Sequence, residues 1–129
     1  MDAQQRLLIE DACRGLVLRA AARADAHDAA GFAALFAADA VLQRPNAAPL
    51  VGRDAIRDAY AQRERSRITR HLVSNTLITV ESATRASGHS LVLLWAGSSD
   101  DAVGVQGRPA QGPVLVGEFD DRFVLGSDG

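Results

Sequence analysis

The apolar residues of this chain change their spacing about halfway along it, and this change limits the folds open to it. Up to about Arg65 they recur every three or four residues, as on one side of an α-helix. From Ile68 onward they alternate with polar residues, as in a strand with one buried face. Helices followed by strands are typical of an α+β fold with helices packed on one face of an antiparallel sheet. The 129 residues have the length of a single domain, 1–129.

Three helices are expected in the first half. The first spans about Gln4 to Asp25 and carries an apolar stripe of Ile9, Cys13, Leu16, Val17, Ala20 and Ala24. Asp28 can cap a second, short helix over 29–37. Gly52-Arg53-Asp54 starts a third helix that runs to about Arg65, with Ile56, Ala59 and Tyr60 on its inward side.

Four segments are predicted to form strands: 40–44, 68–80, 89–97 and 114–125. Turn-forming residues indicate loops over 45–49 and 98–112. Within 68–80, alternation assigns one face to Thr69, His71, Val73, Asn75 and Leu77. The opposite face then carries Ile68, Arg70, Leu72, Ser74, Thr76 and Ile78.

The charged residues argue against two kinds of function. The chain has 14 basic and 16 acidic residues, a net charge of −2, whereas a general nucleic-acid binder needs a strongly positive surface. Every basic residue is Arg, which excludes Schiff-base chemistry by lysine. We therefore expect no nucleic-acid partner.

The cysteine, histidine and apolar residues further limit the kinds of site and the cellular locations that we expect. Cys13 is the only cysteine, which excludes an internal disulfide, and its place in the first helix favours a buried core residue. The three histidines lack the close spacing typical of metal ligands, so no metal is expected. No apolar run reaches the roughly 20 residues of a membrane span. The polar first residues indicate a cytoplasmic protein.

Asp25 is the first candidate for chemistry. It lies about 200° around the helix from Arg23, at about 100° per residue, and so points away from the wet side above Leu18 and Ala21. A carboxylate over an apolar stripe is costly unless it finds a partner. The alternative is a frayed helix end with a solvated Asp25.

His71 is the second candidate, because it shares a strand face with Val73. If the first helix covers this face, Asp25 and His71 can meet. A carboxylate on one imidazole nitrogen fixes the tautomer and raises the basicity of the other, which makes a general base. The alternative is an ordinary core or surface histidine.

The remaining polar residues are weaker candidates. His89 lies in a polar lead-in and is expected to be exposed, and His27 is expected to cap a helix or to be solvated. Asp121 alternates with Phe119 and so either faces a pocket or lies at the surface. Tyr60 is typical of a core residue rather than a catalytic one.

The chain resembles the SnoaL-like group of the nuclear-transport-factor-2-like superfamily, which includes dehydratases, a dehydrochlorinase, an isomerase and polyketide cyclases. The resemblance rests on five motifs in order: ADAHD (24–28), FAALFAADAV (32–41), LVGRDAI (50–56), TRHLVSN (69–75) and GEFDDRF (117–123). It implies a cone-shaped α+β barrel, in which a curved, mostly antiparallel sheet wraps the long helix and encloses one apolar pocket. It also implies a homodimer through the outer sheet face, where Trp95 is a plausible contact.

For this chain the resemblance implies a small-molecule lyase or isomerase. Asp25 and His71 match the family's aspartate and histidine, and would act as the base that removes a proton from carbon. The pocket would hold a hydrophobic ligand and need no metal or organic cofactor. Its lining would consist of Leu18, Ala21, Leu42, Tyr60, Val73, Val92, Leu94, Leu115, Gly117, Phe119 and Asp121.

One departure keeps a second interpretation open. Dehydratases of this group often carry a tyrosine five residues before the aspartate, and here that position is Ala20. A base without this electrophilic partner also fits a non-catalytic module that binds a small ligand or assembles with other chains.

Overall fold

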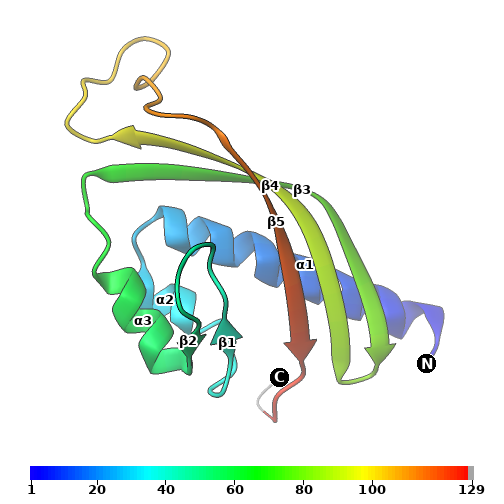
Figure 1. Cartoon of the computed structure of the whole chain (residues 1–129). Helices are drawn as coiled ribbons and strands as arrows, with labels where there is room; N and C mark the ends of the chain where they lie inside the picture. The colour runs from blue at the N-terminus through cyan, green and yellow to red at the C-terminus, as the bar shows by residue number, and fades with distance from the viewer. Residues whose placement is uncertain (128–129) are drawn as a thin grey trace.

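The computed structural model describes residues 1–127, so Asp128 and Gly129 lie outside the described part. Figure 1 shows a strongly curved sheet arching over a long helix, with two short helices and a small hairpin alongside. The helices are α1 (Ala3–Asp25), α2 (Ala29–Ala33) and α3 (Arg53–Ala61). The strands are β1 (Val41–Leu42), β2 (Leu50–Val51), β3 (Arg67–Ser82), β4 (Arg85–Ser98) and β5 (Leu115–Val124). This architecture confirms the predicted α+β class.

Helix α1 forms over nearly the predicted residues. Asp2 caps it: its carboxylate accepts the Gln5 N–H at 2.8 Å, while the Gln5 side chain accepts the Asp2 N–H at 3.2 Å. Cys13, Val17 and Ala24 are buried, and α1 packs mainly against β3. The predicted core position of Cys13 is confirmed. Among residues 1–127, no helix combines the length and apolar character needed to cross a membrane.

The two short helices end earlier than predicted. Asp28 does cap α2, because its carboxylate accepts the Gly31 N–H at 2.9 Å. However, α2 ends at Ala33 rather than at residue 37, since the amides of Leu35 and Phe36 bond to carbonyls three residues back, in tighter turns. Helix α3 likewise ends at Ala61 instead of Arg65, and a turn through 62–66 follows.

The strands form two antiparallel sheets, one of β1 and β2 and one in the order β3-β4-β5. Strand β2 was not predicted; it pairs with β1 across the 45–49 loop, with Leu42 opposite Leu50. Strand β4 begins at Arg85, ahead of the predicted start at His89, because its polar first residues pair with both neighbouring strands. The predicted loop after β4 is exposed along most of its length.

A β-bulge in β3 changes which side chains face the helix. The pairing register with β4 shifts between Ser74 and Leu77, and Asn75 has a left-handed φ of 54°. Beyond the bulge Thr76 and Ile78 take the more buried side, while Leu77 is 71% exposed. The prediction that Asn75 and Leu77 share a face with His71 is therefore wrong, because alternation cannot anticipate an inserted residue.

A compact apolar cluster joins the end of α1 to the short helices. Ala24, Phe32, Ala33 and Ile56 are its buried members. Ile56 is completely buried, which contributes roughly 1.5–3 kcal/mol relative to an exposed side chain. Tyr60 packs on the cluster with its ring centroid 4.2 Å from that of Phe32. This cluster fixes the position at which α1 ends.

Candidate active site

Three contacts join the Asp25 carboxylate to one short stretch of β3. Its Oδ1 accepts a hydrogen bond from Thr69 Oγ1 at 2.8 Å and lies 2.5 Å from Nδ1 of His71. Its Oδ2 accepts the backbone N–H of His71 at 2.9 Å. Asp25 is the last residue of α1, so the contacts tie the end of the helix to the strand. The two residues that the sequence singled out are thus neighbours.

The pair is largely shielded from water. The side chains of Asp25 and His71 are 15% and 16% exposed, so the alternative of a solvated Asp25 at a frayed end is wrong. An ionised carboxylate only accepts hydrogen bonds, so Nδ1 of His71 carries the proton in this contact. The lone pair of a neutral His71 ring is then on Nε2. This is the tautomer that a base acting through Nε2 requires.

The strand register shows which other residues share the face of His71. Opposite residues on antiparallel strands point to the same side. Leu94 and Leu115 lie in the same row as His71. The next row contains Val73, Val92 and Gly117, where a Cβ on Gly117 would meet the Val92 side chain at 3.2 Å. The Phe119 ring lies 6.4 Å from the His71 ring, centroid to centroid.

The expected pocket-lining residues differ in burial. Val92 is buried, while Ala21, Leu42, Leu94 and Phe119 are partly buried. Leu18 and Leu115 are 50% and 52% exposed, which is more than an enclosed apolar pocket would leave them.

Asp121 is on the inward side of β5, where it pairs with Gly88 of β4. No hydrogen bond or ion pair to its carboxylate is found within residues 1–127. Burial, and to a lesser extent the neighbouring Asp120 carboxylate, raise the pKa of Asp121. Asp121 is therefore an unpaired acid on the same face of the sheet as Phe119.

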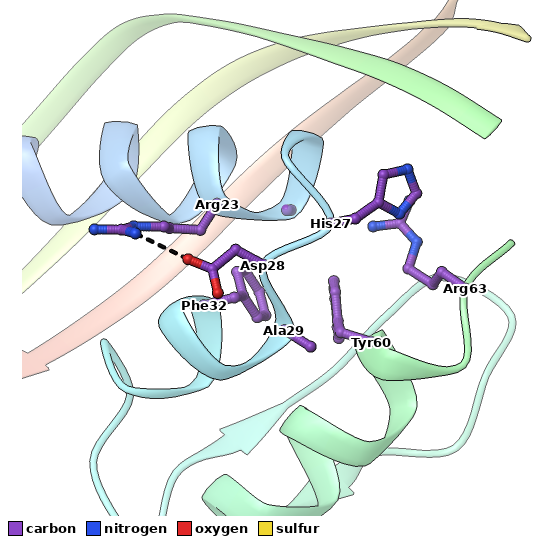
Figure 2. A pocket seen from close by; sticks show the side chains of 8 residues that line it. Arg23, His27, Asp28, Ala29, Phe32, Tyr60 and Arg63 are labelled. Carbon is purple, nitrogen blue, oxygen red and sulfur yellow. Dashed lines mark hydrogen bonds and ion pairs between the residues drawn. The ribbon is translucent and has the colours of Figure 1, made fainter. Parts of the chain in front are cut away.

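Two hollows lie elsewhere, where the turn after α1 meets α2 and the end of α3. Figure 2 shows the side chains that line the smaller one. Tyr60 lines both, and it is the only predicted pocket residue that does. The larger has a volume of about 330 Å³. Neither hollow has Asp25 or His71 in its lining. In the described range 1–127, no group of three or more His, Cys, Asp or Glu side chains could hold a metal ion.

Comparison with known families identifies the fold. A model of the SnoaL-like domain matches residues 5–129. The chain belongs to the SnoaL-like family. No curated protein matches this SnoaL-like chain.

Solved structures share the SnoaL-like fold at low sequence identity. A proposed scytalone dehydratase from Novosphingobium aromaticivorans DSM 12444 is 23% identical with a TM-score of 0.78, over 98% of this chain and 80% of that one. A type 2 hexachlorocyclohexane dehydrochlorinase, LinA, is 16% identical with a TM-score of 0.79, over 98% and 81% of the two chains. A Catenulispora acidiphila protein in complex with S-DNPA is 22% identical with a TM-score of 0.67, over 96% and 85%.

Sequence reasoning on this SnoaL-like chain missed one partner of Asp25. Thr69 is 2% exposed, and its hydroxyl bonds to the same carboxylate oxygen that His71 contacts. The signal was present, because the two-residue spacing of Thr69 and His71 places both on one strand face.

The other two histidines lie apart from the pair. The predicted exposure of His89 is met only in part: 41% of its side chain is accessible, and its Nε2 lies 3.7 Å from the Glu118 carboxylate. His27 helps to cap the end of α1, as predicted: it has a left-handed φ of 57°, and its backbone N–H donates to the Ala24 carbonyl at 3.2 Å. Its side chain is also engaged, because Nε2–H donates to the Arg67 carbonyl at 2.7 Å.

Proposed function

We propose that this SnoaL-like protein is a lyase or isomerase that works without a cofactor, with His71 as its general base and Asp25 as the residue that orients and stabilises it. The observation that carries the proposal is the double contact of Asp25 with His71, to the imidazole and to the backbone amide. Because one carboxylate holds both the Nδ1 edge of the ring and the backbone of the same residue, the ring has little freedom to turn, which keeps Nε2 in one direction.

The reaction follows from this arrangement. Nε2 of neutral His71 takes a proton from a carbon next to an electron-withdrawing group, and the C–H electrons form a new double bond. A lyase completes the step when a β-substituent leaves with its bonding electrons. An isomerase completes it when the proton returns to a different carbon. Asp25 stabilises the imidazolium that exists in between.

A hydrophobic ligand fits the residues on the same sheet face. Val73 and Val92 offer apolar contacts in the row next to His71, and the Phe119 ring lies 6.4 Å from the His71 ring, centroid to centroid. Related folds support small-molecule binding, since the Catenulispora protein holds S-DNPA and LinA is named for a chlorinated cyclohexane.

A second candidate function is a non-catalytic module that binds a small ligand. Ala20 favours it, because this residue packs its methyl group against the apolar cluster at the position where the family often has a tyrosine hydroxyl. Without that hydroxyl, the hydrogen-bond donor that activates a carbonyl or a leaving group must come from another residue or from the ligand itself.

We also propose that the outer sheet face forms a homodimer. Leu72, Leu93 and Val116 lie in one row across the three strands and are 52%, 41% and 84% exposed. Leu91 and Trp95, on the same side of β4, are 40% and 43% exposed. Contiguous apolar surface of this kind is typical of protein–protein contacts.

The test of catalysis uses hexachlorocyclohexane, followed by chloride release, and 3-hydroxycyclohexanone, followed by loss of water. A general base contributes about 10²–10⁴-fold to a rate, so His71→Gln should lose at least about 100-fold in kcat/KM. His89→Gln, on the outer face, should keep the wild-type rate. Circular dichroism checks that both variants fold. Equal rates in wild type and His71→Gln, or no turnover of either compound, would favour the binding module.

A further inference from the structure

The larger hollow has a lining unlike that expected of the proposed active site. It lies where the turn after α1, the start of α2 and the end of α3 meet, and its volume is about 330 Å³. This is at the lower end of the roughly 300–1,000 Å³ typical of small-molecule sites. Its charged and aromatic lining residues are His27, Asp28, Arg57, Tyr60, Arg63 and Arg65.

The charges around this hollow do not balance. Its one acid, Asp28, already pairs with Arg23 at 2.8 Å and accepts the Gly31 N–H, two contacts that lower the pKa of Asp28. Arg57 lies 3.4 Å from Asp58 and 3.8 Å from Asp54. Across residues 1–127, no carboxylate lies within 4.0 Å of the Arg63 or Arg65 guanidinium. Two cations therefore border the hollow without a counter-ion.

The protein core holds the aromatic wall of the hollow in place. Tyr60 stacks on Phe32, and the Arg63 guanidinium carbon lies 5.3 Å from the Tyr60 ring centroid. Burial raises the pKa of Tyr60, although the nearby Arg63 and Arg44 charges oppose the shift. The hydroxyl of Tyr60 therefore stays protonated at neutral pH and can donate a hydrogen bond.

The side chains around the turn form two groups (Figure 2). Asp28 turns toward Arg23, whereas Arg63 reaches toward the His27 ring. The His27 ring is held by its bond to the Arg67 carbonyl through Nε2–H. The acid is thus engaged on one side of the turn while cationic and imidazole groups gather on the other.

We propose that this hollow binds a small organic anion with a carboxylate or phosphate group, held by Arg63 and Arg65 against the Tyr60 ring. Guanidinium groups suit both anions because their planar N–H donors match two oxygens at once. The site is separate from Asp25 and His71, so it does not depend on the proposed reaction.

The test is titration of the protein with phenyl phosphate and with phenylacetate, each followed by NMR and calorimetry. Benzyl alcohol serves as the uncharged analogue. Both anions should bind with resonance shifts in the turn after α1, and benzyl alcohol should not. Arg63→Gln and Arg65→Gln should each weaken binding about tenfold, as expected for one charge-assisted hydrogen bond.

Two variants separate this proposal from its alternatives. Arg122→Gln removes an exposed charge from β5 and should leave the affinity unchanged. His71→Gln should also leave it unchanged, even if it abolishes turnover. No binding of either anion overturns the proposal. Equal weakening of binding by Arg122→Gln and Arg63→Gln also overturns it, because that result indicates only general attraction to positive charge. Loss of binding in His71→Gln alone overturns it as well.

Discussion

Asp25 contacts both the imidazole and the backbone amide of His71, at 2.5 and 2.9 Å. The contact therefore has two consequences. It orients the imidazole for chemistry, and it fastens the end of α1 to β3. Measurements on variants must separate the two effects.

Asp25→Asn should lower the free energy of unfolding by about 1–3 kcal/mol, the cost of leaving buried hydrogen-bonding groups unsatisfied. The amide NH₂ cannot accept the bonds that Thr69 and His71 now donate to the carboxylate. Urea denaturation measures the change. Asp11→Asn, at an exposed position of the same helix, should shift it by less than about 0.5 kcal/mol. Similar losses in both variants would show that the contact has no structural role.

Asn75 should tolerate glycine but not a β-branched residue. Its φ of 54° lies in the left-handed region, which glycine adopts freely and valine does not. Asn75→Val should therefore cost about 1–3 kcal/mol in thermal or urea unfolding. Thr79→Val, at an exposed position farther along β3, is the matched control and should be close to neutral. An Asn75→Val variant as stable as wild type contradicts the bulge.

Asp121 should make the protein less stable as the pH rises. Its pKa is raised above the ordinary 3.8 in the folded protein by burial and by Asp120, so the folded state binds this proton more tightly than the unfolded state. The stability it contributes is complete below about pH 4 and is lost as the pH rises through the folded pKa. Asp121→Asn should therefore be more stable than wild type at pH 7, with a gap that closes in acid. Urea melts from pH 3 to 8 measure it, and a gap that widens in acid contradicts the assignment.

Leu93→Glu should convert the proposed dimer to a monomer. Leu93 lies at the centre of the exposed row between Leu72 and Val116, where a buried carboxylate would be costly. Light scattering after size-exclusion chromatography reports the mass of each variant. Val103→Glu, in the exposed loop after β4, should leave the mass unchanged. A monomeric wild type rules out this use of the outer face.

The local sequence pattern was sufficient to predict those elements whose formation is governed mainly by the burial of one face. The apolar stripe predicted α1, and alternation predicted the inward side of β5, because burial of one face governs both elements. The position of Asp25 over that stripe also led to His71, since an acid on an apolar face needs a partner.

Features that depend on packing between distant segments could not be predicted from the local sequence pattern. Asn75 inserts a residue into β3, and the two-residue strand β2 exists only because β1 lies opposite it. The exposed side chains of Leu18 and Leu115 depend on which segments cover the sheet. The basic hollow was missed because Arg57, Arg63 and Arg65 appear in the sequence as an ordinary solvated helix face and turn.

The segment between α1 and α2 is only three residues long, yet three sets of contacts, to β3, to α1 and to α2, meet around it. Asp25 reaches β3, His27 reaches the Arg67 carbonyl, and Asp28 binds Arg23 while it caps α2. Adding or deleting one residue here would put all three out of alignment together. In natural relatives with the same contacts, this stretch should therefore vary by substitution while its length stays constant.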